Sequence, residues 1–221
     1  MDRYFDEELK ELKSKLILMA TLVQGMIKMA IDALKERSPE KIKEVFNSEQ
    51  DVNLLQIQID DYALKLIALK QPAASDLRLV VAAMKINSDL ERIADQAVNI
   101  AERAQDLIKL PPLKPLIDIP RMAQITQEMV KDAIESFINR NSSLAKGVCK
   151  RDDEVDALNG QIFRELLTYM MQDPNNIARS LDLILVARHL ERIADLATNI
   201  CEDVYYIVEG KDIRHHIQDN T

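Results

Sequence analysis

Apolar residues recur every three or four positions along most of the chain, which is the period of an α-helix with one buried face. Near the start they fall at Leu9, Leu12, Leu16, Met19 and Val23, and later segments repeat the pattern. The pattern predicts six helices, over residues 3–36, 39–70, 73–109, 120–146, 150–172 and 175–209.

Prolines mark the breaks between these helices, because proline inside a helix loses a hydrogen bond and clashes with the preceding turn. Ser38 and Pro39 predict a helix start, with Ser38 as the cap and Pro39 at the first helical position. Pro72 and Pro174 mark two more starts. Four prolines lie in LPPLKPLIDIP, residues 110–120, so we interpret this stretch as a linker between two halves.

The two halves resemble each other in sequence. Met19 and Ala20 reappear as Met122 and Ala123, and the segment LERIAD occurs at residues 90–95 and again at 190–195. We therefore predict an all-α fold of two tandem three-helix bundles, related by an internal pseudo-two-fold repeat. The expected domains are residues 1–110, a proline-rich linker over 111–119, residues 120–211, and a polar C-terminal tail over 212–221.

The LERIAD segments place polar side chains along one face of their helices. At 100° per residue, four polar residues of each copy fall within one narrow stripe, and the apolar residues lie on the opposite side. The stripes consist of Glu91, Asp95, Asn99 and Glu102 in the first copy and of Glu191, Asp195, Asn199 and Glu202 in the second. Each stripe is therefore predicted to face away from the core. Oxidase-type di-iron chemistry is disfavoured, because it needs inward-facing Glu-x-x-His pairs.

The preceding helix of each half carries a second polar pair. Glu49 and Asn53 align with Asp152 and Asp156 in the other half. An antiparallel neighbour would bring each pair beside a LERIAD pair, and such clusters of oxygen ligands suit a divalent or trivalent cation. Carboxylates packed this closely repel one another without a cation. Two alternatives stay open: a solvated face, in which Arg92 pairs with Asp95, and ion pairs between the second-helix residues and arginines.

Composition limits the possible partners. The net charge of −8 disfavours nucleic acid, and no apolar run approaches the roughly 20 residues that span a membrane, so direct membrane insertion is not expected. No signal peptide is visible, and Cys149 and Cys201 fit reduced thiols in a cytoplasmic protein. His189 is expected at the surface, with an extra ligand in one half as the alternative, and no dedicated site is expected from His215 and His216 in the tail.

The chain resembles the PhoU family of phosphate-transport regulators over nearly its whole length. The resemblance rests on QPAASDLRLVVAAMKINSDLERIADQAVNIAE in the first half and on ARHLERIADLATNICEDVYYIVEGK in the second. It implies a cytoplasmic protein that is peripheral to the membrane through a phosphate ABC transporter. Its expected partners are the transporter ATPase, a sensor histidine kinase and a second copy in a homodimer.

The resemblance also implies multinuclear iron or zinc clusters, or other divalent cations, at the repeated acidic motifs. The implied ligands are Glu49, Asn53, Glu91 and Asp95 in the first half and Asp152, Asp156, Glu191 and Asp195 in the second, with Asn99, Glu102, Asn199 and Glu202 as additional candidates. Asn53 replaces the carboxylate present at Asp156, so the first site is expected to bind cations more weakly or to hold fewer ions. No nucleophile or base stands out, which favours a non-enzymatic regulator or adaptor over a carboxylate-bridged metalloenzyme, with a metal-storage bundle as a further alternative. The resemblance implies that the regulation is negative.

Overall fold

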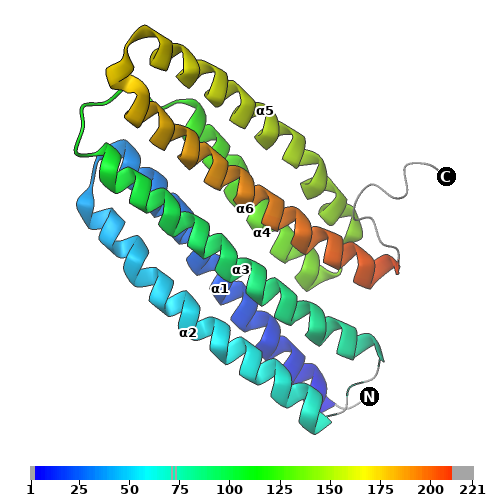
Figure 1. Ribbon diagram of the computed structural model, residues 1–221. Coiled ribbons are helices and arrows are strands. Elements are labelled where there is room, and N and C mark those ends of the chain that lie inside the picture. Colours follow the sequence, from blue (N-terminus) through cyan, green and yellow to red (C-terminus); the bar gives the residue numbers. More distant parts are fainter. Residues whose placement is uncertain (1–2, 71, 73, 211–221) are drawn as a thin grey trace, which may run out of the picture.

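The computed structural model describes residues 3–70, 72 and 74–210, and within them it is built from helices without strands (Figure 1). The helices are α1 (Arg3–Glu36), α2 (Pro39–Lys70), α3 (Ala74–Leu107), α4 (Asp118–Asn139), α5 (Ser142–Gln172) and α6 (Ile177–Glu209). A single 3-10 turn, Pro174–Asn176, precedes α6. The predicted all-α fold of two three-helix units is confirmed.

The two three-helix units pack side by side. Helices α1, α2 and α3 contact one another, as do α4, α5 and α6, and the halves join where α3 packs on α6 and α1 packs on α4. Helices α2 and α5 occupy the two outer edges (Figure 1). Helices α3 and α6 run antiparallel, so the two LERIAD segments lie near each other at the centre of the molecule.

One continuous apolar core runs through both halves. The third helix of each half contributes buried alanines to this core. They are at most 1% exposed, and they are Ala94, Ala97, Ala101, Ala194 and Ala197. Small side chains allow the backbones of neighbouring helices to approach closely. Longer side chains of α1, such as Met19 and Met26, fill the space between the helices.

The boundary between the fourth and fifth helices was predicted wrongly. Helix α4 ends at Asn139 and α5 begins at Ser142, whereas the sequence pattern predicted helices over 120–146 and 150–172. Arg140 takes the left-handed conformation (φ 50°), and Asn141 caps α5 by accepting a hydrogen bond from the Leu144 amide at 3.0 Å. The break contains neither glycine nor proline, so the apolar period ran on across it.

The predicted start of the second helix is confirmed. Helix α2 begins at Pro39, where Ser38 Oγ accepts a hydrogen bond from the Lys41 amide at 3.4 Å, and Gly210 (φ 69°) ends α6. Helix α4 begins at Asp118, two residues before the predicted start at 120, and Pro120 lies in its first turn, where proline costs no hydrogen bond. The assigned domain boundaries stay predictions, and the tail over 212–221 lies outside the described residues.

Helix α1 differs from the membrane expectation. Residues 6–36 are long and apolar enough to cross a membrane by length and composition alone, and among the described residues only this helix meets that test. Half of the apolar window is buried inside the protein, and α1 lies between α2 and α4 (Figure 1). The same composition is typical of a core helix in a bundle, so α1 is weak evidence for a membrane span.

Candidate functional site

The LERIAD carboxylates lie on the surface of the bundle, as predicted. Glu91 is half-buried and Asp95 is exposed, while Ile93 between them is fully buried. Glu191 and Asp195 repeat this arrangement on α6. Both stripes therefore point away from the apolar core.

Three contacts fix the register of α5 against α6. Ser142 Oγ donates to Glu209 Oε1 at 2.6 Å, and Asn159 Nδ2 donates to Glu191 Oε2 at 2.9 Å. Between them, the Lys146 ammonium lies over the Tyr205 ring, 4.7 Å from its centroid. Three residues before Asn159 is Asp156, and four residues after Glu191 is Asp195. The antiparallel register therefore places Asp156 and Asp195 at the same level.

Electrostatic coupling joins the four carboxylates of the second half, Asp152, Asp156, Glu191 and Asp195, which we call the second acidic cluster. Burial, followed by Asp156 and Asp195, raises the pKa of Asp152 to about 6. Burial and Asp156 also raise the pKa values of Glu191 and Asp195. Asp156 therefore lies close enough to the other three carboxylates to disfavour their negative charges.

The first acidic cluster comprises Glu49, Asn53, Glu91 and Asp95. Burial, then Asp95, and also Glu49 from α2, raise the pKa of Glu91. The α2–α3 register is set one turn away, where the buried Asn87 amide donates to Gln56 O and to Asp60 Oδ1, both at 2.9 Å. That register brings Asn53 near the level of Glu91. With two carboxylates and an amide around Glu91, this cluster carries less charge than the second.

Ion pairing with arginine does not account for these residues. Arg92 pairs with Asp89 at 3.3 Å rather than with Asp95. Across the part of the chain that the structure describes, no candidate carboxylate of either cluster has an ion-pair partner within 4.0 Å. Within the same residues, no three carboxylate, imidazole or thiol groups converge as they would around a bound ion. The helices bring the groups to one place, and side-chain rotation would be needed to close a cation site.

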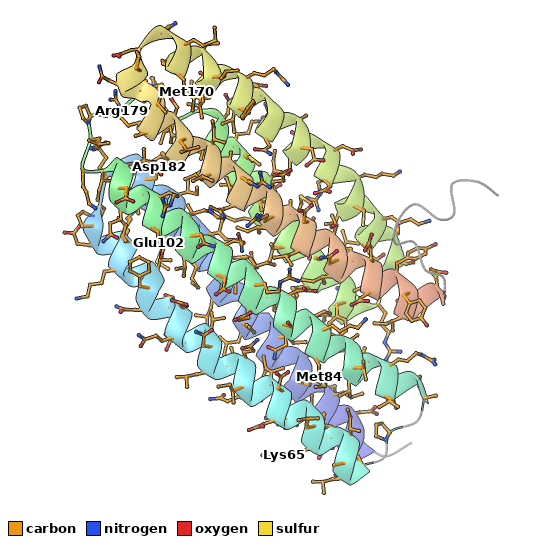
Figure 2. All side chains as sticks on the ribbon, viewed as in Figure 1. Lys65, Met84, Glu102, Met170, Arg179 and Asp182 are labelled. Carbon is orange, nitrogen blue, oxygen red and sulfur yellow. The ribbon has the colours of Figure 1, made fainter. Side chains whose placement is uncertain are left out.

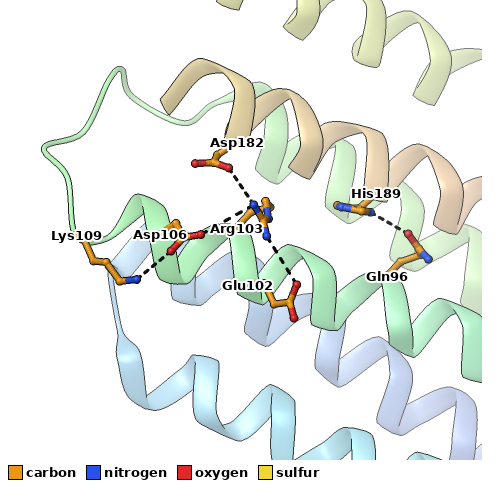
Figure 3. Close-up of polar contacts among 7 residues, drawn as sticks. All are labelled: Gln96, Glu102, Arg103, Asp106, Lys109, Asp182 and His189. Carbon is orange, nitrogen blue, oxygen red and sulfur yellow. Dashed lines mark hydrogen bonds and ion pairs between the residues drawn. The ribbon is translucent and has the colours of Figure 1, made fainter. Parts of the chain in front are cut away.

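The additional candidates lie along α3 and α6. Glu102 pairs with Arg103 at 3.8 Å (Figure 3), and Asn99 lies half-buried on α3. Asn199 and Glu202 line a cavity of about 310 Å³ with Lys85, at the seam between α3 and α6. These last two residues therefore lie at the contact between the two halves.

The same seam, at which Figure 2 labels Glu102 of α3 and Asp182 of α6, contains residues whose role the sequence did not reveal (Figure 3). His189 was expected at the surface, but it is half-buried, and its Nδ1 lies 2.9 Å from Gln96 Oε1 of the other half. Burial, with Arg192, lowers the pKa of His189 to about 4, so the ring is neutral at pH 7. Arg103 also bridges the halves, at 3.4 Å from Asp182. A helical period cannot predict such contacts, because it does not say which helices become neighbours.

The fold and the site together define a class of protein. It is a duplicated all-helical protein with one outward-facing acidic cluster in each repeat. The model of the PhoU domain matches this chain twice, over residues 16–104 and 119–204. The chain therefore belongs to the PhoU family.

Curated relatives and solved structures agree with this assignment. A PhoU homolog of the phosphate-specific transport system, from Aquifex aeolicus, is 46% identical over 214 residues, covering 96% of this chain and 97% of the relative. A homolog with the same description from Zymomonas mobilis is 37% identical, and the match covers 95% of this chain and 88% of the relative. The crystal structure of PhoU from Pseudomonas aeruginosa superposes with a TM-score of 0.89 at 36% identity, covering 94% of this chain and all of that one. The crystal structure of the phosphate transport system regulatory protein PhoU from Streptococcus pneumoniae superposes with a TM-score of 0.85 at 28% identity. This match covers 94% of this chain and 98% of that one.

Proposed function

We propose that this chain is a non-enzymatic regulator of phosphate uptake that works with a phosphate-specific ABC transporter. It acts as a cytoplasmic adaptor between the transporter ATPase and a sensor histidine kinase, and it represses the phosphate-starvation response. The observation that carries the proposal is the nearly full-length similarity to accessory proteins of phosphate transport, in both sequence and fold. The acidic surface, with a net charge of −8, favours protein partners over nucleic acid.

We further propose that the two acidic clusters bind cations that regulate this adaptor. The donor set supports the proposal, because carboxylate and amide oxygens are ligands for hard divalent and trivalent cations. Asp152, Asp156, Glu191 and Asp195 would hold ions in the second half. A bound cation would neutralise carboxylates that now raise one another's pKa values. Iron, zinc or another divalent cation would occupy the clusters according to supply.

Metal content tests the cation proposal directly. Replacing Glu191→Gln together with Asp195→Asn should abolish cation binding by the second half, as measured by equilibrium dialysis and elemental analysis. The charge-matched control is Glu128→Gln with Glu135→Gln, two exposed carboxylates on α4, and it should bind cations as the parent does. Equal cation binding by both double variants would show that the acidic stripe is a solvated face.

A deletion strain tests the regulatory role. Loss of the gene should raise transcription of the phosphate transporter when phosphate is abundant, and complementation should restore repression. Repression that does not depend on this chain would contradict the proposal. Cation binding without any effect on phosphate uptake would instead favour a metal-storage bundle.

A homodimer is the proposed assembly. Large apolar side chains are exposed together where α5 ends and α6 begins, and they provide a surface for a second copy; they are Phe163, Leu167, Met171, Ile177 and Leu181. Light scattering after size exclusion should give twice the chain mass. Leu167→Asp should shift the chain to monomer, whereas Leu18→Asp, at an exposed position on α1, should not. A monomeric parent protein would refute this assembly.

A further inference from the structure

We propose that Cys149 and Cys201 form a redox-sensitive thiol pair, in which Cys149 is an oxidation site and Cys201 resolves it into a disulfide between α5 and α6. Both cysteines are free thiols in the structure. This modification site lies in the second half only. It goes beyond the regulatory function proposed above and does not depend on it.

The register of the two helices places the cysteines opposite each other. Cys149 comes three residues after Lys146, and Cys201 comes four residues before Tyr205, in an antiparallel pair that the Lys146–Tyr205 contact at 4.7 Å holds together. In the Asn159–Glu191 hydrogen bond, Asn159 lies ten residues after Cys149 on α5, and Glu191 lies ten residues before Cys201 on α6. At 1.5 Å per residue, this second contact is about 15 Å away along both axes, so the two contacts bracket the cysteines at one level.

The thiols also meet across this level. The side chains of Cys149 and Cys201 lie close enough to interact electrostatically. Cys201 is completely buried, whereas Cys149 is half-buried and packs against the edge of the core. The neighbouring Cys201 side chain lowers the pKa of Cys149, and a larger thiolate fraction speeds attack on an oxidant. A small oxidant therefore reaches the partly exposed Cys149 first, because the Cys201 side chain is buried.

The other half of the molecule supplies an internal comparison. Phe46, which lies 103 residues before Cys149, is its equivalent in the first half, as Met19 is of Met122. Ala101 lies 100 residues before Cys201 and is its equivalent, at the spacing of the two LERIAD segments. Ala101 is fully buried, as Cys201 is, so an alanine satisfies this position in the same fold. Packing therefore does not require sulfur at either position, and the facing thiols are a property of the second repeat alone.

The oxidation proceeds in two steps with a peroxide as the co-reactant. The Cys149 thiolate attacks one oxygen of hydrogen peroxide, the O–O bond breaks, and hydroxide leaves, which gives a sulfenic acid at Cys149. The sulfur of Cys201 then attacks the Cys149 sulfur, the S–O bond breaks, and the leaving hydroxide takes up the Cys201 proton as water. Two thiols are oxidised by two electrons and the peroxide is reduced to water. Thiol reductants reverse the change.

The disulfide would lie beside the second acidic cluster. Cys149 precedes Asp152 by three residues on α5, and Cys201 neighbours Glu202 on α6. A covalent link there would hold the two helices that carry the cluster in one register. Oxidation should therefore raise the thermal midpoint of the chain by several degrees, because the link restricts the unfolded chain.

Mass spectrometry of the full chain tests the pair. The protein is treated with hydrogen peroxide, blocked with N-ethylmaleimide and digested with trypsin. We expect the two free thiols to disappear together and the peptide GVCK to be linked to IADLATNICEDVYYIVEGK. Dithiothreitol should restore both thiols and the original thermal midpoint. Independent loss of the two thiols, or a disulfide only between two chains, would overturn the proposal.

Single variants separate the two roles. Cys201→Ala, which copies the first repeat, should leave Cys149 as a sulfenic acid that dimedone traps. Cys149→Ala should leave Cys201 unmodified in the folded chain, because its thiol is buried. Circular dichroism checks that both variants fold. Peroxide labelling of Cys201 in the folded Cys149→Ala chain would contradict the assignment of Cys149 as the first site of attack.

Discussion

Asn87 is the residue on which the α2–α3 register, and with it the first acidic cluster, most depends. Its side chain is 0% exposed, and its amide donates to Gln56 O and to Asp60 Oδ1, both at 2.9 Å. Asn87→Asp keeps the shape of the side chain, removes both donated hydrogen bonds, and places a second carboxylate against Asp60. It therefore tests the donor function of this residue rather than its packing.

The expected loss of stability follows from these contacts. Two hydrogen bonds contribute about 1 kcal/mol each, and an uncompensated buried charge brings the total to about 3–5 kcal/mol. Asn87→Ala should cost about 2 kcal/mol, because it adds no charge and Ala187 occupies the equivalent position of the second half. Acidification should reduce the destabilisation caused by Asn87→Asp, because the protonated carboxyl group at position 87 can again donate a hydrogen bond to Asp60.

Urea unfolding followed by far-ultraviolet circular dichroism measures the effect. The Asn87→Asp midpoint should fall by about 1 M or more. Asn47→Asp adds the same charge at an exposed position of α2 and should stay within about 0.5 kcal/mol of the parent. A free energy of unfolding for Asn87→Asp that equals that of this control would refute the assigned register.

Further predictions concern packing, pH and cations. Ala97→Leu should destabilise the fold by about 1–3 kcal/mol through overpacking, because Ala97 is 0% exposed, while Ala157→Leu at an exposed site should be neutral in thermal unfolding. The pKa of Asp152 is raised from 3.8 to about 6, so between these pH values the folded metal-free chain holds a proton that the unfolded chain releases. Stability should therefore fall as pH rises through this window, and Asp152→Asn should reduce the slope in pH-dependent melts. A cation at a hundredfold excess over its Kd should add about 2.7 kcal/mol to the parent in the same melts, and an unchanged melting curve would count against binding.

The helices and the outward direction of the acidic stripes could be predicted from the sequence. A 3.6-residue period determines which side of a helix is apolar, so Glu91 and Asp95 had to lie opposite Ile93. The duplicated LERIAD segment showed that the chain contains two equivalent units. The helix break at Arg140 could not be predicted from glycine or proline, because neither residue is present there. Asn141 was a usable signal, because asparagine is a favoured N-cap residue.

The side-chain contacts between helices could not be predicted from the periodic pattern of the sequence. The contact of His189 with Gln96 joins residues from different halves, and a single helix gives no sign of it. Asn159 donates a hydrogen bond to Glu191, although it belongs neither to a LERIAD stripe nor to the polar pair of the preceding helix. These contacts depend on register and on which helices pack together, and both are set by the shared core rather than by any local motif.

We propose that this chain binds the ATPase subunit of a phosphate transporter and that cations at its acidic clusters control the binding. The affinity of the purified chain for the purified ATPase subunit tests this most directly, measured by calorimetry with added divalent cation and again with chelator. We expect specific binding that chelation weakens several-fold, and the Glu191→Gln, Asp195→Asn double variant should weaken it to the same extent in the presence of cation. Absence of binding under both conditions would refute the proposal.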